Sequence, residues 1–120
     1  MVESVEAVDL AEALVHLTAP WRPSTVAAVN GHVLRVVRAQ GEFSWHAHPK
    51  TDELFLVMSG RLSIQTEAGE VRLGPGQLHV VPKGVRHRPS SAEGADLLLF
   101  EPGSTVNTGD SPGPLTAPSD

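Results

Sequence analysis

The chain has 120 residues, a formal net charge of −5 at neutral pH and no cysteine, and these three facts exclude several kinds of protein. The length provides one domain with a single core rather than two. The nine lysines and arginines are scattered along the chain, so we expect no basic face and no nucleic-acid partner. Without cysteine, disulfides and thiolate metal sites are excluded, and a bound metal would have to use histidine and carboxylate.

The apolar segments of the chain are too short to cross a membrane. No stretch approaches 18 consecutive apolar residues, and the N-terminus lacks the basic segment and apolar core of a signal peptide. We therefore expect a protein without a membrane partner. The lack of cysteine is consistent with the reducing cytoplasm, which is the expected location.

The first segment has the periodicity of a helix, because apolar residues recur at helical spacing at Leu10, Ala13, Leu14 and Leu17. This pattern predicts a helix over about 5–17, with Ser4 as its N-cap and an apolar stripe that packs against a larger body. The prolines at residues 20 and 23 end the helix and lead into extended chain.

From residue 26 onward the pattern changes to that of strands. The predicted strands are 26–29, 33–39, 54–58, 61–66, 70–73, 78–81, 85–89 and 96–100. Asn30-Gly31 favours a type I′ hairpin turn, and Gly41 is expected to end the strand that follows. Many short strands with frequent turns predict an all-β sandwich or barrel over about 26–101, within a domain of residues 1–105. Residues 106–120 are rich in Pro, Gly, Ser and Thr, and we expect them to form a flexible tail.

Two histidines and a glutamate lie close together between two predicted strands. On an extended chain His46 and His48 point to the same side, and a turn over residues 49–52 can bring Glu53 back towards them. Two imidazole nitrogens and a carboxylate oxygen suit a divalent transition metal. For an isolated pair of this kind, two surface histidines beside an exposed Glu would be the commoner interpretation.

A second pattern further along the chain supplies a fourth candidate. Gly76, Pro82, Gly84 and His87 are spaced as Gly-x5-Pro-x-Gly-x2-His, a combination that chance would rarely produce in this composition. Pro82 and Gly84 bend the chain, so the short strand after them can deliver His87 beside the first three residues.

Together the two patterns resemble the motifs of the cupin family. The matching residues are Gly41…His46-x-His48-x4-Glu53-x6-Gly60 and Gly76-x5-Pro82-x-Gly84-x2-His87. Four residues separate Gly41 from His46 where the family usually has five, and Ser91 stands where Asn is often found; neither departure removes a candidate ligand. The end of the chain, residues 101–110, is similar to a subgroup often labelled mannose-6-phosphate-isomerase-like.

The resemblance implies a double-stranded β-helix, the jelly-roll barrel of cupins, with a short N-terminal helix. It also implies a metal held by His46, His48, Glu53 and His87. Such a set leaves one or two coordination positions free, which is typical of a catalytic metal. The ligand types do not choose among Fe, Mn, Ni, Co, Cu and Zn.

The leading functional hypothesis is a metal-dependent enzyme, a dioxygenase or an isomerase or epimerase, that acts on a small polar organic molecule. With no tyrosine and no cysteine available, proton transfer would fall to metal-bound water, Glu53 or His79. For His79, an ordinary hydrogen-bonded or exposed histidine is the commoner interpretation. Arg35 and Gln65 can point into the barrel and orient a substrate, but outward positions fit the pattern at least as well.

Two other functions and one assembly state follow from the same residues. The chain could be a sugar- or metabolite-binding module without turnover, or a scaffold that carries little metal. The nearly uninterrupted apolar strands at 54–58 and 97–100 leave more apolar surface than one thin barrel can hide, which predicts a homodimer.

Overall fold

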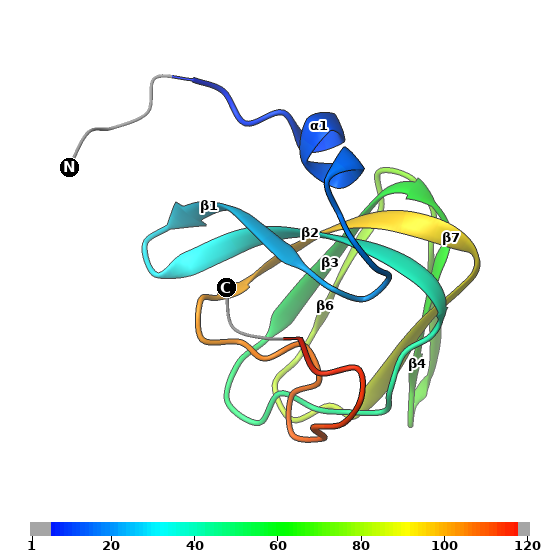
Figure 1. Cartoon of the computed structure of the whole chain (residues 1–120). Helices are drawn as coiled ribbons and strands as arrows, with labels where there is room; N and C mark the ends of the chain where they lie inside the picture. Colours follow the sequence, from blue (N-terminus) through cyan, green and yellow to red (C-terminus); the bar gives the residue numbers. More distant parts are fainter. Residues whose placement is uncertain (1–5, 118–120) are drawn as a thin grey trace.

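The computed structural model describes residues 6–117, which form one short helix and seven strands (Figure 1). The elements in chain order are α1 (Leu10–Val15), β1 (Ser24–Val29), β2 (His32–Glu42), β3 (Glu53–Gly60), β4 (Leu62–Thr66), β5 (Gly69–Leu73), β6 (Leu78–Val81) and β7 (His87–Pro102). The predicted all-β architecture with a short N-terminal helix is therefore confirmed.

The long strand β7 joins the two halves of the barrel. All pairings are antiparallel, with the order β1-β2-β7-β3-β6, while β4 pairs with β5 and with the first residues of β7. The second half of β7 lies between β2 and β3. The separate strands predicted at 85–89 and 96–100 are thus wrong: they belong to one strand, which continues through Gly94 at a φ of 100°.

The turn predicted at Asn30-Gly31 is confirmed, whereas the strand end predicted at Gly41 is not. Asn30 and Gly31 have φ values of 48° and 80°, as a type I′ turn requires, and they join β1 to β2 as predicted. Gly41 does not end β2, contrary to the prediction. The strand runs on to Glu42, and the pairing register shifts between Ala39 and Gly41, so Gly41 lies at an irregularity within the strand.

The helix is shorter than predicted and has a different cap. The Asp9 carboxylate accepts a hydrogen bond from the Glu12 amide at 3.2 Å, which makes Asp9 the N-cap; Ser4 lies outside the described residues. No residue of α1 is fully buried. The helix lies over β2, where Arg38 donates to the Leu14 carbonyl at 3.3 Å.

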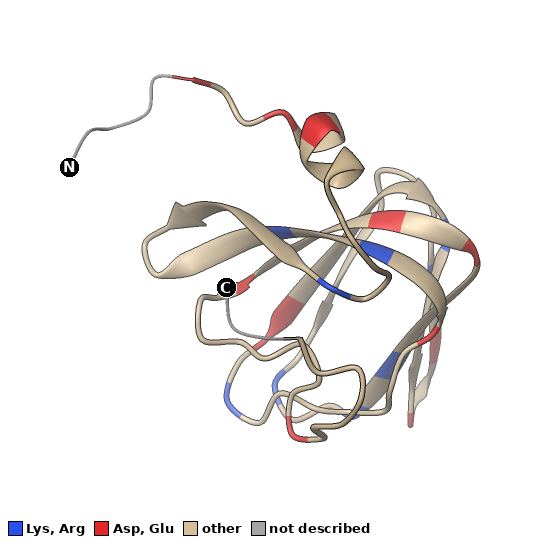
Figure 2. Ribbon diagram, viewed as in Figure 1, with Lys and Arg blue, Asp and Glu red and all other residues tan. Residues whose placement is uncertain are grey.

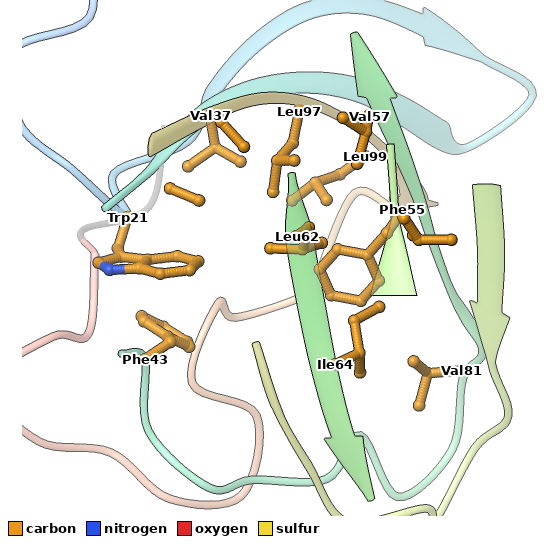
Figure 3. Packing of buried hydrophobic residues seen from close by; sticks show 13 residues of the cluster. Trp21, Val37, Phe43, Phe55, Val57, Leu62, Ile64, Val81, Leu97 and Leu99 are labelled. Carbon is orange, nitrogen blue, oxygen red and sulfur yellow. The ribbon is translucent and has the colours of Figure 1, made fainter. Parts of the chain in front are cut away.

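The hydrophobic core is formed by the inward-facing residues of the strands together with two aromatic residues outside them. Alternate residues of β3 and β7 are buried, among them Phe55, Val57 and Leu97, as expected when every second side chain faces the interior. Figure 3 shows Trp21 and Phe43 side by side at one end of this cluster; their ring centroids are 4.9 Å apart. The polar residues described below lie next to this aromatic end of the core.

The distribution of charge agrees with the expectation of no basic face. Figure 2 shows the lysines and arginines spread over several strands and loops rather than gathered on one element. Within residues 6–117, no helix is long and apolar enough to cross a membrane. Residues 106–117 form turns that contact the barrel, and the flexibility expected for residues 106–120 stays a prediction.

Gly60 offers a direct test of the barrel geometry. It has a φ of 80°, and a Cβ there would meet the carbonyl oxygen of Gly94 and lie 2.8 Å from Ala95 Cα. Gly31 has the same φ, but a Cβ there would meet nothing. We expect Gly60→Ala to lower the free energy of unfolding by about 1–3 kcal/mol more than Gly31→Ala, because only the first adds a steric clash to the backbone strain. Equal losses in urea unfolding would contradict the close approach of β3 and β7.

Candidate metal centre

The four residues predicted as ligands come from three separate parts of the chain. His46 and His48 lie in the loop between β2 and β3, while Glu53 is the first residue of β3 and His87 the first of β7. An isolated antiparallel bridge joins the loop to β7: the His46 amide donates to the His87 carbonyl at 3.0 Å, and the His87 amide donates to the His46 carbonyl at 2.8 Å. The backbone itself thus brings the two histidines together.

The side chains of the four residues converge inside the barrel. One potential ligand atom from each of them lies within 4.8 Å of the corresponding atoms of the others. All four residues are buried, with exposed fractions of 1% for His46, 6% for His48, 3% for Glu53 and 0% for His87. The interpretation as two surface histidines beside an exposed Glu is therefore wrong.

Hydrogen bonds to the backbone orient two of the imidazoles. Nδ1 of His46 lies 2.9 Å from the Ser44 carbonyl oxygen, and Nδ1 of His87 lies 2.9 Å from the Val85 carbonyl oxygen. Because a carbonyl only accepts, each Nδ1 carries the hydrogen. The lone pair of each Nε2 is then free for a metal, an arrangement typical of histidine ligands.

The atoms that face one another in the cluster lack partners. In the described part of the chain, Nε2 of His46, His48 and His87 and Oε1 of Glu53 are buried without a hydrogen bond, although Glu53 Oε1 lies 3.2 Å from His48 Nε2 and 3.5 Å from His87 Nε2. Buried polar atoms are rarely left unpaired. Four such atoms around one point fit a divalent cation bound by three nitrogens and one oxygen.

The local electrostatics favour the ligand forms of these side chains. Burial lowers the pKa of His46 to about 4, and the nearby His87 adds to this effect, so the imidazole is neutral at physiological pH. Burial alone would raise the pKa of Glu53, but contacts with His48, His87 and Glu101 outweigh it and hold that pKa below its usual range. The site thus presents a neutral His46 imidazole and an ionised Glu53 carboxylate.

A second buried carboxyl group, Glu101, lies behind Glu53 and was not predicted. Burial and the adjacent Glu53 raise the pKa of Glu101 to about 9, although Arg35 opposes the shift. Arg35 Nη1 lies 2.6 Å from Glu101 Oε2, while Glu101 Oε1 is buried without a hydrogen bond. The inward position of Arg35 is one of the two alternatives left open by the sequence. The sequence signal for Glu101 is its place two residues beyond Leu99, on the inward face of β7.

A narrow pocket leads to the cluster. Its volume is about 30 Å³, room for roughly two water molecules. Polar lining comes from His46, Glu53 and Asn107, and most of the remaining lining is apolar: Trp21, Val37, Phe43, Phe55, Leu97 and Leu99. Trp21 and Asn107 were not predicted. Trp21 has a φ of 62°, which is unusual for a bulky residue. Its position in the pocket depends on long-range packing, which the sequence pattern does not reveal.

Two other candidate residues lie outside the cluster. His79 lies on β6 opposite Phe55, and it belongs neither to the group of four nor to the lining of the pocket. Gln65 accepts two hydrogen bonds from Arg88 at 2.9 and 2.6 Å. It alternates along β4 with the core residue Ile64 and therefore points away from the interior.

The segments that form this site also match a known protein family. Residues 33–103, from β2 to just beyond β7, match the family model described as a cupin domain. The chain belongs to the cupin family. Its similarity to the mannose-6-phosphate-isomerase-like subgroup stays a prediction.

Similar proteins share the cupin fold over most of this chain. The cupin-2 domain-containing protein from Shewanella frigidimarina NCIMB 400 is 34% identical, with a TM-score of 0.77 over 79% of this chain and 93% of that one. A hydroquinone 1,2-dioxygenase from Sphingomonas sp. TTNP3 in complex with 4-nitrophenol has a TM-score of 0.74 at 24% identity over 83% of this chain and 33% of that one, which shows a common fold only.

The uncharacterized protein YdbB of Bacillus subtilis (strain 168) is a relative in sequence. It is 38% identical over 68 residues, which are 56% of this chain and 60% of YdbB. The cupin chain thus spans less than two thirds of that relative, and the aligned part carries no assigned activity.

Removal of one candidate ligand tests the site. We expect His87→Ala to lower the metal content of tag-free protein from stoichiometric to near zero after equilibration with Zn²⁺, because one of three nitrogen ligands is lost. The affinity should fall by more than the roughly 10- to 100-fold typical of losing an outer hydrogen bond. His32→Ala is the matched control, since His32 is exposed and stacks on Phe100 at 5.1 Å. Equal metal content in both variants by elemental analysis would contradict the site.

Proposed function

We propose that this cupin is a metal-dependent enzyme that acts on a small organic molecule. The observation that carries the proposal is the group of four buried, unpaired ligand atoms, two of which belong to residues that line a pocket, His46 and Glu53. Three nitrogens and one oxygen leave one or two coordination positions, as in catalytic rather than structural metal sites. When bound, a divalent metal supplies Lewis-acid chemistry to oxygen atoms of a substrate.

The protein's own residues prepare the site in three ways. Bonds from Nδ1 to backbone carbonyls fix the rings of His46 and His87, so little reorganisation is needed on binding. The raised pKa of Glu101 leaves that carboxyl group neutral, so no second negative charge beside Glu53 opposes its ionised form. The apolar walls exclude bulk water, and this strengthens electrostatic interactions inside the pocket.

The lining of the pocket narrows the class of substrate. The substrate predicted from the sequence is a small polar molecule, but most residues around the pocket are aliphatic or aromatic. A sugar would leave several hydroxyl groups without partners there, which is unfavourable. Glu53 supplies only one negative charge, so a divalent ion would keep a net positive charge that favours phenolate or carboxylate oxygens. We propose a substrate with such oxygens at one end, which a pocket of about 30 Å³ can admit, and an apolar body at the other, which at that volume would lie at the mouth of the pocket.

The two reaction types under consideration are those of a dioxygenase and of an isomerase or epimerase. The apolar pocket favours a dioxygenase over an isomerase of sugars. His79 does not line the pocket, so Glu53 is the chain's own group best placed to move a proton there. Residues 6–117 include no tyrosine or cysteine that could replace it. The alternative function is binding of a small molecule without turnover.

Turnover in the absence of dioxygen separates these functions. We expect metal-loaded protein, assayed on a panel of small phenols and aromatic carboxylates, to consume dioxygen in step with substrate and to lose activity under anaerobic conditions. Oxygen electrode and chromatographic measurements check this. Unchanged anaerobic turnover would indicate an isomerase instead. Binding of a panel member without turnover in air would contradict the enzyme and support the binding protein.

We also propose that the chain forms a homodimer through the outer face of β3, β6 and β7. Two rows of apolar residues face outward in register there: Val80, Leu54 and Phe100, and next to them Leu78, Leu56 and Leu98. Leu78 and Val80 are 55% and 41% exposed. A continuous apolar patch of this kind is typical of an interface.

The assembly state can be measured directly. We expect light scattering at micromolar concentration to give a mass near twice 12.7 kDa, and Leu78→Glu to shift it to the monomer because a charge would be buried in the interface. Val15→Glu is the matched control, since Val15 is the more exposed residue at 78% and lies on α1. A monomeric wild-type protein would rule out the proposed dimer.

A further inference from the structure

The segment of residues 107–110, which we call the C-terminal clamp, lies against the loop that carries His46 and His48. The sequence singles out this Asn-Thr-Gly-Asp segment only as a subgroup resemblance. We propose that the clamp is a positioning element that holds the two histidines in ligand geometry, with Asp110 as its key residue. The inference rests on the metal site proposed above.

Asp110 binds the residue between the two histidines on both of its backbone polar groups. The Asp110 amide donates to the Ala47 carbonyl at 3.0 Å, and the Ala47 amide donates to Asp110 Oδ1 at 2.8 Å. Ala47 is 7% exposed, so water has little access to replace these bonds. Without them, the loop would contain buried polar groups that lack partners, at a cost of about 1–3 kcal/mol each.

Gly109 brings the clamp into contact with a ligand ring. It has a φ of 53°, and a Cβ at this position would meet the Ala47 carbonyl oxygen and lie 3.1 Å from His46 Cδ2. Cδ2 is bonded to Nε2, the atom that faces the cluster. The clamp therefore bounds the space in which the metal-facing edge of the His46 ring can move, and only glycine allows this approach.

The clamp is itself anchored at its other end. The Asn107 side chain donates to the Trp21 carbonyl at 3.1 Å and to the Leu115 carbonyl at 2.9 Å, and it accepts from the Ala117 amide at 2.8 Å. Thr108 is 1% exposed, and its hydroxyl lies 2.7 Å from that of Thr116. Residues 107–117 thus form a folded unit rather than a single contact.

These contacts give the histidine loop a partner on each edge, as in a central strand. His87 binds His46 on one edge, Asp110 binds Ala47 on the other, and the His48 carbonyl accepts from the Gly84 amide at 2.9 Å. The extended form points His46 and His48 to the same side. The loop is outside the regular strands, so its conformation depends on these few bonds. Loss of the clamp should therefore loosen the ligand pair while leaving the barrel in place.

Binding of Co²⁺ to Asp110 variants tests this inference, because the visible spectrum of Co²⁺ reports ligand geometry. We expect Asp110→Ala to lower Co²⁺ affinity about 10- to 100-fold, the usual effect of removing a group that orients a ligand, and to change the spectrum. Asp110→Asn keeps the acceptor oxygen and should restore most of the affinity and the spectrum. Gly109→Ala, which displaces the clamp without removing a hydrogen-bonding group, should resemble Asp110→Ala.

The controls separate positioning from stability and from the metal site itself. Asp9→Ala also removes an exposed bond from a backbone amide to a carboxylate, but far from the cluster, and should leave Co²⁺ binding unchanged. Melting of the metal-free variants reports any loss of stability, which alone would not alter the spectrum of bound Co²⁺. If Asp110→Ala binds Co²⁺ with wild-type affinity and spectrum, the clamp inference is wrong. If the wild-type protein binds no Co²⁺, the proposed metal site is wrong as well.

Discussion

The antiparallel bridge between His46 and His87 is the interaction on which the candidate metal centre depends. Two backbone hydrogen bonds of 3.0 and 2.8 Å connect a loop to the start of the longest strand. They fix which side of the chain faces inward at both residues, since a shift of register by one residue would turn each side chain to the opposite face. The inward orientation of the two imidazoles follows from this pairing, while Glu53 is placed by its own pairing with Val81 on β6.

The interior of the barrel contains several buried polar and charged side chains. Three histidines, two glutamates and Arg35 are buried together, which would be unfavourable without compensation. Arg35 binds Glu101 and the carbonyls of Gly103 and Thr105, and the raised pKa of Glu101 removes one charge. The ligand atoms that face one another at the cluster have no hydrogen bonds, and neither has Glu101 Oε1; a divalent cation is the partner that would complete the cluster.

The parts of the site that could be predicted from the sequence are those fixed by local spacing. His46, His48 and Glu53 lie near one another in the chain, and the bend at Pro82 and Gly84 predicts that His87 is directed towards them. Glu101, Trp21 and the clamp could not be found this way, because they reach the site through strand register and chain return over long sequence distances. The strand pattern predicted the barrel, but it split β7 in two and ended β2 early, since Gly94 and Gly41 break the apolar pattern without breaking the ladder.

The start of the helix and the lining of the pocket could also not be predicted from the sequence. Helical periodicity located α1, but the helix begins later than predicted, and Asp9 caps it by accepting a hydrogen bond from the Glu12 amide. The apolar lining combines side chains from β2, β3 and β7 with three residues outside the regular strands, Trp21, Pro23 and Phe43. No single segment of the sequence carries that pattern, so the substrate class could be approached only with the structure in hand.

The most direct test of the account is an anomalous difference map from crystals of the metal-loaded protein, with data collected on both sides of the absorption edge of the metal. We expect one strong peak about 2.0–2.3 Å from Nε2 of His46, His48 and His87 and from a carboxylate oxygen of Glu53. A map with no peak inside the barrel, or with the metal bound only by surface residues, would contradict it.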